Sequence, residues 1–184
     1  QDVLDSITFD AQASDDQGNG GDQDSANDGA FTSTLGYTMT WDADSWSYAP
    51  LNEDQPEGGF TLSRAEAIIT IQAAADPTLD DCVDAEIGVV EQLDGMGNLT
   101  RERDAESLEP GSDSESTFQS GSVELSNGDT PIYVYVECRP LSGEIDGNPL
   151  ALVIRMIVVQ ESYEDLAPEL QSMLDDIEIT EAKG

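Results

Sequence analysis

Residues 149–160 constrain the fold most, because apolar side chains lie on both faces of this run. It reads P-L-A-L-V-I-R-M-I-V-V-Q, and Arg155 is its only charged residue. Successive side chains of a β-strand point to opposite faces of the sheet, so a strand without polar alternation needs cover on both sides. The run therefore predicts a central strand with one packing layer above it and another below it.

Residues 130–139, T-P-I-Y-V-Y-V-E-C-R, form a second run rich in β-branched and aromatic residues, which favour strands. One face of this run is apolar, and the other carries two tyrosines and a glutamate. We expect the two runs to pair as antiparallel neighbours in the middle of one sheet. The apolar face consists of Ile132, Val134, Val136 and Cys138, and the other face of Tyr133, Tyr135 and Glu137.

Shorter segments with alternating apolar residues predict the remaining strands of this sheet. A charged strand at an edge and a strand that ends at the Asn127-Gly128 turn precede the central pair. The acidic stretch 104–116 is predicted to be a loop. The predicted strands cover residues 35–42, 45–49, 60–64, 66–74, 99–103 and 117–125, with a short closing strand at 177–179.

A first helix is predicted to begin at Thr78, because Thr78 and Asp81 have the spacing of a capping box. Its apolar residues recur at helical spacing and form one stripe, which we expect to pack on the sheet. Gly95 and Gly97 are predicted to end the helix. The stripe contains Leu79, Cys82, Val83, Ile87, Val90 and Leu93.

A second helix is predicted over residues 163–176, with Ser162 and Asp165 at capping spacing. We place Pro168 in its first turn, where the backbone N–H groups have no helical partner in any case. The apolar residues again fall on one stripe, as expected for a helix packed on a sheet. They are Leu166, Leu170, Met173, Leu174 and Ile177.

The chain carries 40 acidic residues against six basic ones, a net charge of −34, and it contains no histidine. Such charge repels nucleic acid and anionic lipid, so we predict no nucleic-acid partner. The charge reflects either a solvated surface, including adaptation to salt, or affinity for a cationic partner or Ca²⁺. Without histidine, the usual Ser–His–Asp, Cys–His and zinc sites are excluded, and Lys183 is the only lysine.

Two cysteines, Cys82 and Cys138, each occupy an apolar position of a predicted core element. We predict a disulfide between the first helix and the central sheet; two separate buried thiols are the alternative. The acidic, lysine-poor surface, rich in Asn, Gly and Ser, favours an extracellular or cell-surface location. No stretch of about 20 apolar residues occurs, so no membrane span is predicted.

The N-terminal segment resembles the C-terminal one. Residues 3–9, V-L-D-S-I-T-F, align with residues 173–179, M-L-D-D-I-E-I, and agree at every apolar position. We interpret residues 1–11 as the tail of a preceding copy of the same domain, with chance similarity as the alternative. Residues 12–30 then form an acidic Gly/Ser/Asp linker, and residues 31–184 a single domain. A docked tail predicts a swapped or segment-mediated dimer.

The order of elements, from G-Y-T-M-T-W at residues 36–41 to D-L-A-P-E-L-Q-S-M-L-D-D-I at residues 165–177, resembles the PsbP/Mog1-like family. The resemblance implies an α+β fold in which a central antiparallel β-sheet has two main helices packed on it. The chain is also similar to secreted bacterial proteins with a W-D-x-x-x-W strand pair and a Y-V-E-C strand. These patterns lie at Trp41, Asp42 and Trp46 and at residues 135–138.

Relatives in this family are mostly binding or assembly modules, and no functional residue carries over to this chain. We therefore predict a non-enzymatic binding or scaffold module, the last unit of a tandem-repeat protein, with no catalytic, cofactor or metal residue assigned. The alternative is a carboxylate-dependent glycan hydrolase, which would need two acids about 5–10 Å apart in a pocket. Trp41 and Trp46 are the candidate ligand-contact aromatics, with core packing as their alternative role.

Overall fold

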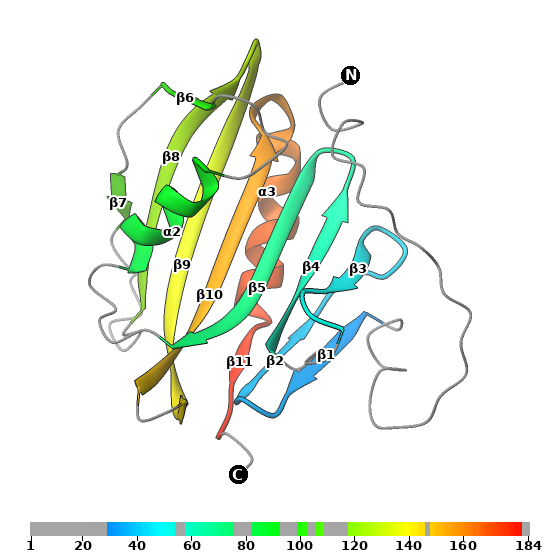
Figure 1. Cartoon of the computed structure of the whole chain (residues 1–184). Helices are drawn as coiled ribbons and strands as arrows, with labels where there is room; N and C mark the ends of the chain where they lie inside the picture. The colour runs from blue at the N-terminus through cyan, green and yellow to red at the C-terminus, as the bar shows by residue number, and fades with distance from the viewer. Residues whose placement is uncertain are drawn as a thin grey trace.

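The computed structural model describes a large antiparallel sheet, a small one and two helices, which is the predicted α+β class (Figure 1). The predicted N-terminal tail, residues 1–11, lies outside the described part of the chain, and so does nearly all of the predicted linker. The described residues are 29–53, 58–75, 82–92, 99–102, 106–108, 118–145 and 148–181.

The elements follow one another as strands, a helix, strands, a helix and a short closing strand. In chain order they are β1 Ala30–Ser33, β2 Tyr37–Thr40, β3 Ser47–Pro50, β4 Gly59–Arg64, β5 Ala67–Ala75, α2 Cys82–Val90, β6 Leu99–Arg101, β7 Glu106–Leu108, β8 Gln119–Asn127, β9 Thr130–Ile145, β10 Asn148–Val159, α3 Gln160–Asp175 and β11 Glu178–Ile179.

The predicted central pair is confirmed: β9 and β10 are antiparallel neighbours in the middle of the large sheet. The strand order is β3-β4-β5-β10-β9-β8-β6, and β7 pairs with β8 as well. Val153 lies opposite Cys138, and Met156 lies opposite Tyr135. Because β10 is flanked by β5 and β9 and covered on both faces, most of its apolar residues are buried, and Ile157 and Val159 are partly buried.

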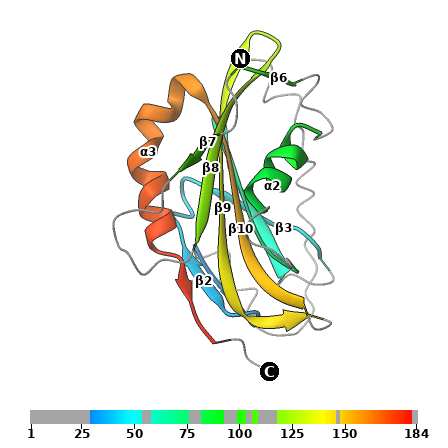
Figure 2. The same cartoon turned by 90° about the vertical axis from the view of Figure 1, so that its left-hand side faces the viewer.

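Different elements cover the two faces of this sheet, as Figure 2 shows from the side. One face packs against α3 and the small sheet β1-β2-β11. The other packs against α2, whose residues Cys82, Val83, Ile87 and Val90 are buried. Alternation along β9 divides its side chains between the two layers, so Tyr135 belongs to the α3 side and Val136 to the α2 side.

The small sheet was not predicted, and Ala30, assigned to the linker, is the first residue of β1. Phe31 in this strand is buried against Tyr37 and Phe60, with ring centroids 5.6 and 4.5 Å apart. Pairing of β1 with β2 thus orders a segment whose composition resembles a linker. Likewise, β7 lies within the stretch that was predicted to be an acidic loop, because β8 offers it an unpaired edge.

The helix α3 begins three residues before its predicted start, and the predicted cap at Ser162 is wrong. The chain passes directly from β10 into α3; Val159 is the N-cap and makes no side-chain capping bond. The Val159 N–H instead donates to the Glu66 carbonyl in the β4–β5 turn, at 2.9 Å. Tertiary packing of the strand end therefore takes the place of a local capping motif.

Pro168 lies in the middle of α3 and not in its first turn, which corrects the prediction. A proline has no N–H to donate to the carbonyl of the residue four positions earlier, here Glu164. Pro168 and Glu164 are both exposed, so solvent can hydrate that carbonyl. The buried stripe of Leu166, Leu170, Met173 and Leu174 keeps the helix on the sheet in spite of the lost bond.

The helix α2 is bound covalently to the central sheet. Cys82, its first residue, and Cys138 of β9 form a disulfide with an S–S distance of 2.02 Å, so the predicted bond is present. The helix ends at Val90, earlier than the glycines predicted to end it. The predicted capping residues Thr78 and Asp81 lie outside the described residues.

Candidate functional site

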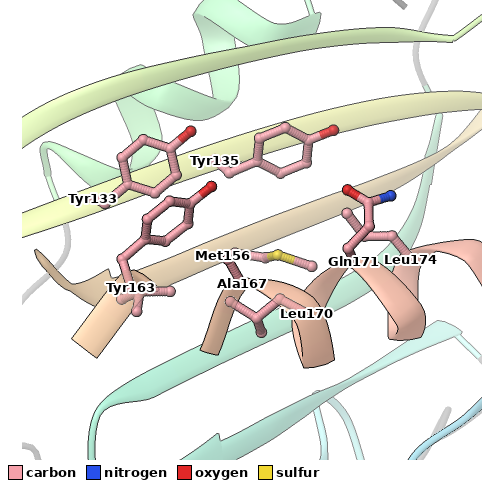
Figure 3. A pocket seen from close by; sticks show the side chains of 9 residues that line it. Tyr133, Tyr135, Met156, Tyr163, Ala167, Leu170, Gln171 and Leu174 are labelled. Atoms are coloured by element: carbon pink, nitrogen blue, oxygen red, sulfur yellow. The ribbon is translucent and has the colours of Figure 1, made fainter. Parts of the chain in front are cut away.

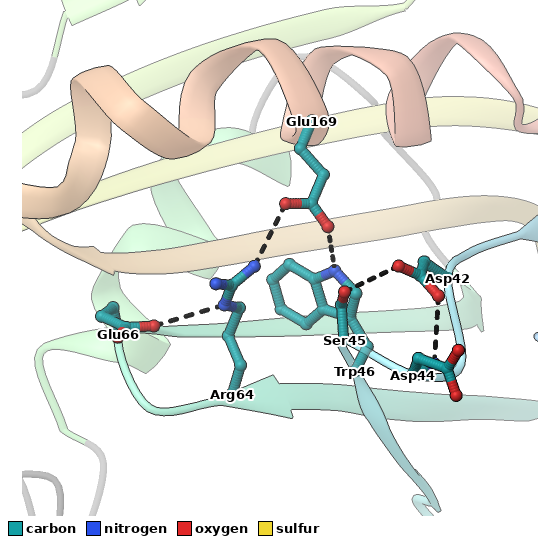
Figure 4. Close-up of polar contacts among 7 residues, drawn as sticks. All are labelled: Asp42, Asp44, Ser45, Trp46, Arg64, Glu66 and Glu169. Atoms are coloured by element: carbon teal, nitrogen blue, oxygen red, sulfur yellow. Dashed lines mark hydrogen bonds and ion pairs between the residues drawn. The ribbon is translucent and has the colours of Figure 1, made fainter.

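Arg64 of β4 ties the sheet to α3, as Figure 4 shows. Its Nη1 donates to Glu169 Oε2 at 3.1 Å, and its Nε donates to Glu66 Oε2 at 3.2 Å. The other oxygen of Glu169 accepts a 2.7 Å bond from Nε1 of Trp46, and the Arg64 guanidinium lies 5.4 Å from the Trp46 ring centroid. A single glutamate on α3 thus satisfies a buried indole and an arginine together.

Arg139 of β9 makes the second tie between the sheet and α3. It forms an ion pair with Glu137 and donates to the last carbonyls of the helix region, Leu174 O at 3.0 Å and Ile177 O at 3.2 Å. Carbonyls at a helix C-terminus lack intrahelical partners and carry partial negative charge, which a guanidinium satisfies well. Glu137 is buried, and it also accepts a 2.7 Å bond from the Tyr135 hydroxyl.

Arg155 of β10 makes the corresponding tie on the other face. Its Nε lies 3.2 Å from Oε2 of Glu86 on α2, and both side chains are largely buried. Each of the three arginines with a described side chain, Arg64, Arg139 and Arg155, is therefore engaged between the sheet and a helix. Their positive charge neutralises acids inside these contacts and leaves little to offset the acidic exterior.

Trp41 and Trp46, the candidate ligand-contact aromatics, both lie in the hydrophobic core. Trp46 is 3% exposed and Trp41 8% exposed. Trp41 stacks on Tyr48 with ring centroids 5.8 Å apart and an interplanar angle of 5°. The rings pack among other aromatic side chains and do not form a platform that a surface ligand could reach.

The described residues hold no pair of buried carboxylates suited to glycan hydrolysis and no group of three or more acids or cysteines arranged for a metal ion. Glu137 is the buried acid among them, and Tyr135 and Arg139 occupy both of its oxygens. A general acid needs access to substrate, and this carboxylate is buried and held by Tyr135 and Arg139.

A cleft lies where α3 crosses β9, and tyrosines line it (Figure 3). Tyr133 and Tyr135 project from β9, and Tyr163 projects from the first turns of α3. The Tyr133 and Tyr163 ring centroids are 4.3 Å apart with an interplanar angle of 42°. Aliphatic side chains of Met156 and Leu170 line the cleft further in, and exposed Gln171 lines it from α3.

We call this feature the tyrosine cleft, defined by Tyr133, Tyr135, Tyr163, Leu170 and Gln171. Its volume is about 60 Å³. Small-molecule sites commonly measure ~300–1,000 Å³. The tyrosine cleft is therefore suited to one inserted side chain or a few water molecules, and not to a cofactor.

The surroundings of the tyrosine cleft raise the pKa of two of its phenol groups, those of Tyr135 and Tyr163. Burial, followed by the charge of Glu137, raises the pKa of Tyr135 well above its usual value near 10. Burial, followed by the neighbouring Tyr133, also raises the pKa of Tyr163. These hydroxyls thus remain hydrogen-bond donors, and the rings keep the electron-rich faces of neutral phenols.

Sequence reasoning placed Tyr133 and Tyr135 on the less apolar face of the central strand but did not single them out. The signal was a Tyr-x-Tyr-x-Glu alternation on a strand expected to be covered on both faces. Tyr163 lies only four residues after β10, and the reversal of the chain into α3 brings it back onto β9.

Neither the models of known protein families nor the sequences of curated proteins match this chain. Solved structures do resemble it. LpqN from Mycobacterium tuberculosis, described as involved in cell envelope biogenesis, has a TM-score of 0.51 at 13% identity, over 78% of this chain and 83% of LpqN. CyanoP, the cyanobacterial PsbP of Synechocystis sp. PCC 6803, has a TM-score of 0.51 at 11% identity, over 82% of this chain and 91% of CyanoP. The chain has the PsbP/Mog1-like fold.

The Ran-binding protein Mog1p of Saccharomyces cerevisiae is a further match, with a TM-score of 0.46 at 12% identity, over 79% of this chain and 91% of Mog1p. The similarity to LpqN and CyanoP shows the fold, and at 13% and 11% identity it says nothing about individual residues. The similarity to secreted proteins through W-D-x-x-x-W remains a prediction. In the described part of this PsbP/Mog1-like chain, neither helix is long and apolar enough to cross a membrane.

Proposed function

We propose that this PsbP/Mog1-like chain is a non-enzymatic binding or scaffold module that acts outside the cytoplasm, in the extracellular space or at the cell surface. Its partner is a protein, and its binding surface is the tyrosine cleft with the adjoining face of β8 and β9. The proposal rests on the half-buried tyrosines of this cleft. Their rings offer contact area and their hydroxyls offer hydrogen bonds to a partner at the protein surface.

The face beside the tyrosine cleft has the composition of a protein-binding surface. In register with β9, Ser122 of β8 lies opposite Tyr135, and Glu124 lies opposite Tyr133. These side chains and both tyrosines are half-buried. Tyrosine supplies rigid amphipathic contact area at low entropic cost, and serine supplies adaptable hydrogen bonds; the two are enriched together in binding surfaces.

The proposed location rests on two observations. The Cys82–Cys138 disulfide is of a kind that persists in oxidising compartments and is rare in the cytosol. One structural neighbour, LpqN, is described as involved in cell envelope biogenesis. Protease accessibility of the protein on intact producing cells tests the location, and complete protection on intact cells together with cleavage after lysis would refute it.

Site-specific photo-crosslinking tests the binding surface. A photoreactive phenylalanine analogue replaces Gln171 at the tyrosine cleft or, as a matched control, Val89, which is exposed on the helix of the opposite face. In producing cells, we expect Gln171 to yield one defined protein adduct that the Val89 variant lacks. Equal adducts from both positions, or none from Gln171, would argue against this surface as the binding site.

We also propose that residues 1–11 are the tail of a preceding copy of the domain, so that the protein is a tandem repeat. The aligned residues 173–179 span the end of α3 and β11, where Met173, Leu174 and Ile177 are buried. The matching Val3, Leu4 and Ile7 therefore have the pattern of a sheet-packing element. If this segment joins two molecules, deleting residues 1–11 should change the protein from a dimer to a monomer in solution or lower its melting temperature. An unchanged oligomeric state together with an unchanged melting temperature would contradict docking.

A further inference from the structure

We infer that the tyrosine cleft binds the cationic head of an arginine or lysine side chain, presented by a basic segment of a partner protein. This inference rests on the proposed binding function and names the chemistry of the partner. The first argument is geometric. Rings from two elements converge at the cleft, Tyr133 and Tyr163 at 4.3 Å between centroids with Tyr135 beside them (Figure 3). Electron-rich ring faces grouped in this way attract cations.

The second argument is charge. Glu164 lies seven residues before Gln171 and Asp175 four residues after it, so helical periodicity places all three on one stripe of α3. Asp175 Oδ1 accepts a 2.9 Å bond from Gln171 Nε2. Glu124 of β8 lies opposite Tyr133 on the neighbouring strand, next to the lining residues. The rim along α3 is therefore acidic, while the tyrosine rings line the cleft with Met156 and Leu170 further in.

The third argument concerns competing cations within the chain. Arg64, Arg139 and Arg155 are each held by a glutamate between sheet and helix. None of these three guanidinium groups lines the tyrosine cleft. Arg139 acts on Tyr135, but its charge is balanced by buried Glu137 beside it. The excess charge of the chain, −34, is acidic and therefore favours and steers a basic partner.

The fourth argument is size. A volume of about 60 Å³ admits the end of one side chain and excludes larger aromatic ligands. An inserted guanidinium or ammonium group would lie against the tyrosine faces, with its donors directed toward the acidic rim.

Titration with a hexa-arginine peptide, a hexa-lysine peptide and a hexa-glutamate control at 0.15 M salt tests the inference, with heteronuclear NMR reporting where each peptide binds. We expect the basic peptides to shift resonances of Tyr133, Tyr135, Tyr163 and Gln171 first. Gln171→Lys should weaken binding about five-fold, as expected for like charges about 4 Å apart in water. Val89→Lys makes the same charge change on the other face and should leave the affinity nearly unchanged.

Ring substitutions separate cation–π attraction from general charge attraction. The double variant Tyr133→Leu/Tyr163→Leu should bind the arginine peptide roughly five- to thirty-fold more weakly, and Tyr133→Phe/Tyr163→Phe should retain most of the affinity. Shifts spread evenly over the acidic surface, or equal losses for Gln171→Lys and Val89→Lys, would overturn the inference. If either result is found but the photoreactive residue at position 171 still crosslinks to a protein in cells, the proposed binding surface is supported. Only the inference that the cleft binds a cationic side chain is then wrong.

Discussion

The two faces of the central sheet hold their helices in different ways. On one face, the 16-residue α3 presents a long apolar stripe and is anchored by two arginines of the sheet, by Arg64 near its middle and by Arg139 at its C-terminal end. On the other, the nine-residue α2 buries four residues and is held by a disulfide and one ion pair. Isolated helices of this length are marginal in water, so α2 relies on its attachment more than α3 does.

The largest effect is expected at the Arg139 tie of α3. Arg139→Met would leave Glu137 buried without a cation and would remove the guanidinium donor of the Ile177 carbonyl, while the Leu174 carbonyl still accepts from the backbone N–H of Ile177. Removing one partner of a buried ion pair costs about 3–5 kcal/mol of unfolding free energy. Urea unfolding of the purified variant measures this loss.

The double variant Glu137→Gln/Arg139→Met is the control for that experiment, because it removes both charges. It should recover a large part of the stability lost in the single variant, since the uncompensated charge is gone while Tyr135 keeps a partner. A double variant as unstable as the single one would show that Arg139 acts mainly as a cap for α3, and not by neutralising Glu137.

The next effect concerns the α2 face. Replacing both Cys82 and Cys138 by alanine opens a loop that spans 56 positions of the sequence. The unfolded chain then gains conformational freedom, and we expect a loss of about 3–4 kcal/mol. Hydrogen exchange should show α2 losing protection well before α3. Equal loss of protection in both helices would mean that the two faces form one cooperative unit.

Alkaline pH should weaken the α3 face selectively. Burial raises the pKa of Tyr37 and of Tyr135, and both residues lie in or against the core on this face. Their unfolded phenols ionise near pH 10 while the folded ones stay protonated. Stability is therefore full below about pH 10 and falls above it, by roughly 1.4 kcal/mol per pH unit for each tyrosine.

Unfolding experiments between pH 8 and pH 11, combined with phenolate absorbance, measure this slope. Tyr37→Phe removes one of the two titrating groups, so the loss per pH unit should become shallower than in the unchanged protein. A slope that does not change in this variant would mean that Tyr37 ionises in the folded state as easily as in the unfolded one.

The smallest effect is expected at Glu169. Glu169→Ala leaves the buried Trp46 N–H without its acceptor and Arg64 without one partner. Because the Glu169 side chain is 37% exposed, water can replace part of the contact, and we expect a loss of about 1 kcal/mol. Thermal unfolding and tryptophan emission report the change. Asp165→Ala, at an exposed position one turn earlier on α3, should alter neither.

Periodicity was enough to predict the central pair, the facing cysteines and most of both apolar stripes, although Leu79 and Leu93 lie outside the described residues and Ile177 follows the end of α3. These features depend on which side chains are buried, and the spacing of apolar residues such as Ile154 and Leu170 indicates this directly. The short strands β1 and β7 could not be predicted in the same way. Each is ordered by pairing with the next strand of the chain, and neither has a strong pattern of its own.

The candidate site was harder to predict than the fold. Tryptophan was singled out because sugars favour exposed aromatic rings, but Trp41 and Trp46 had the alternative of core packing, and both are buried. The tyrosine cleft depends on the angle at which α3 crosses β9, which the sequence does not encode locally. The helix start at Gln160 was missed for a related reason, because a strand contact replaces the capping motif there.

The engagement of the arginines also bears on colloidal behaviour. Within the described residues, β3 ends one side of the large sheet and β1 one side of the small sheet. Strand edges of this kind invite pairing between molecules. With Arg64, Arg139 and Arg155 turned inward, approaching molecules meet mostly carboxylates, so mutual repulsion keeps the edges apart. That protection weakens as the pH falls toward the isoelectric point near 4.1, where we expect the protein to associate while its core is still intact.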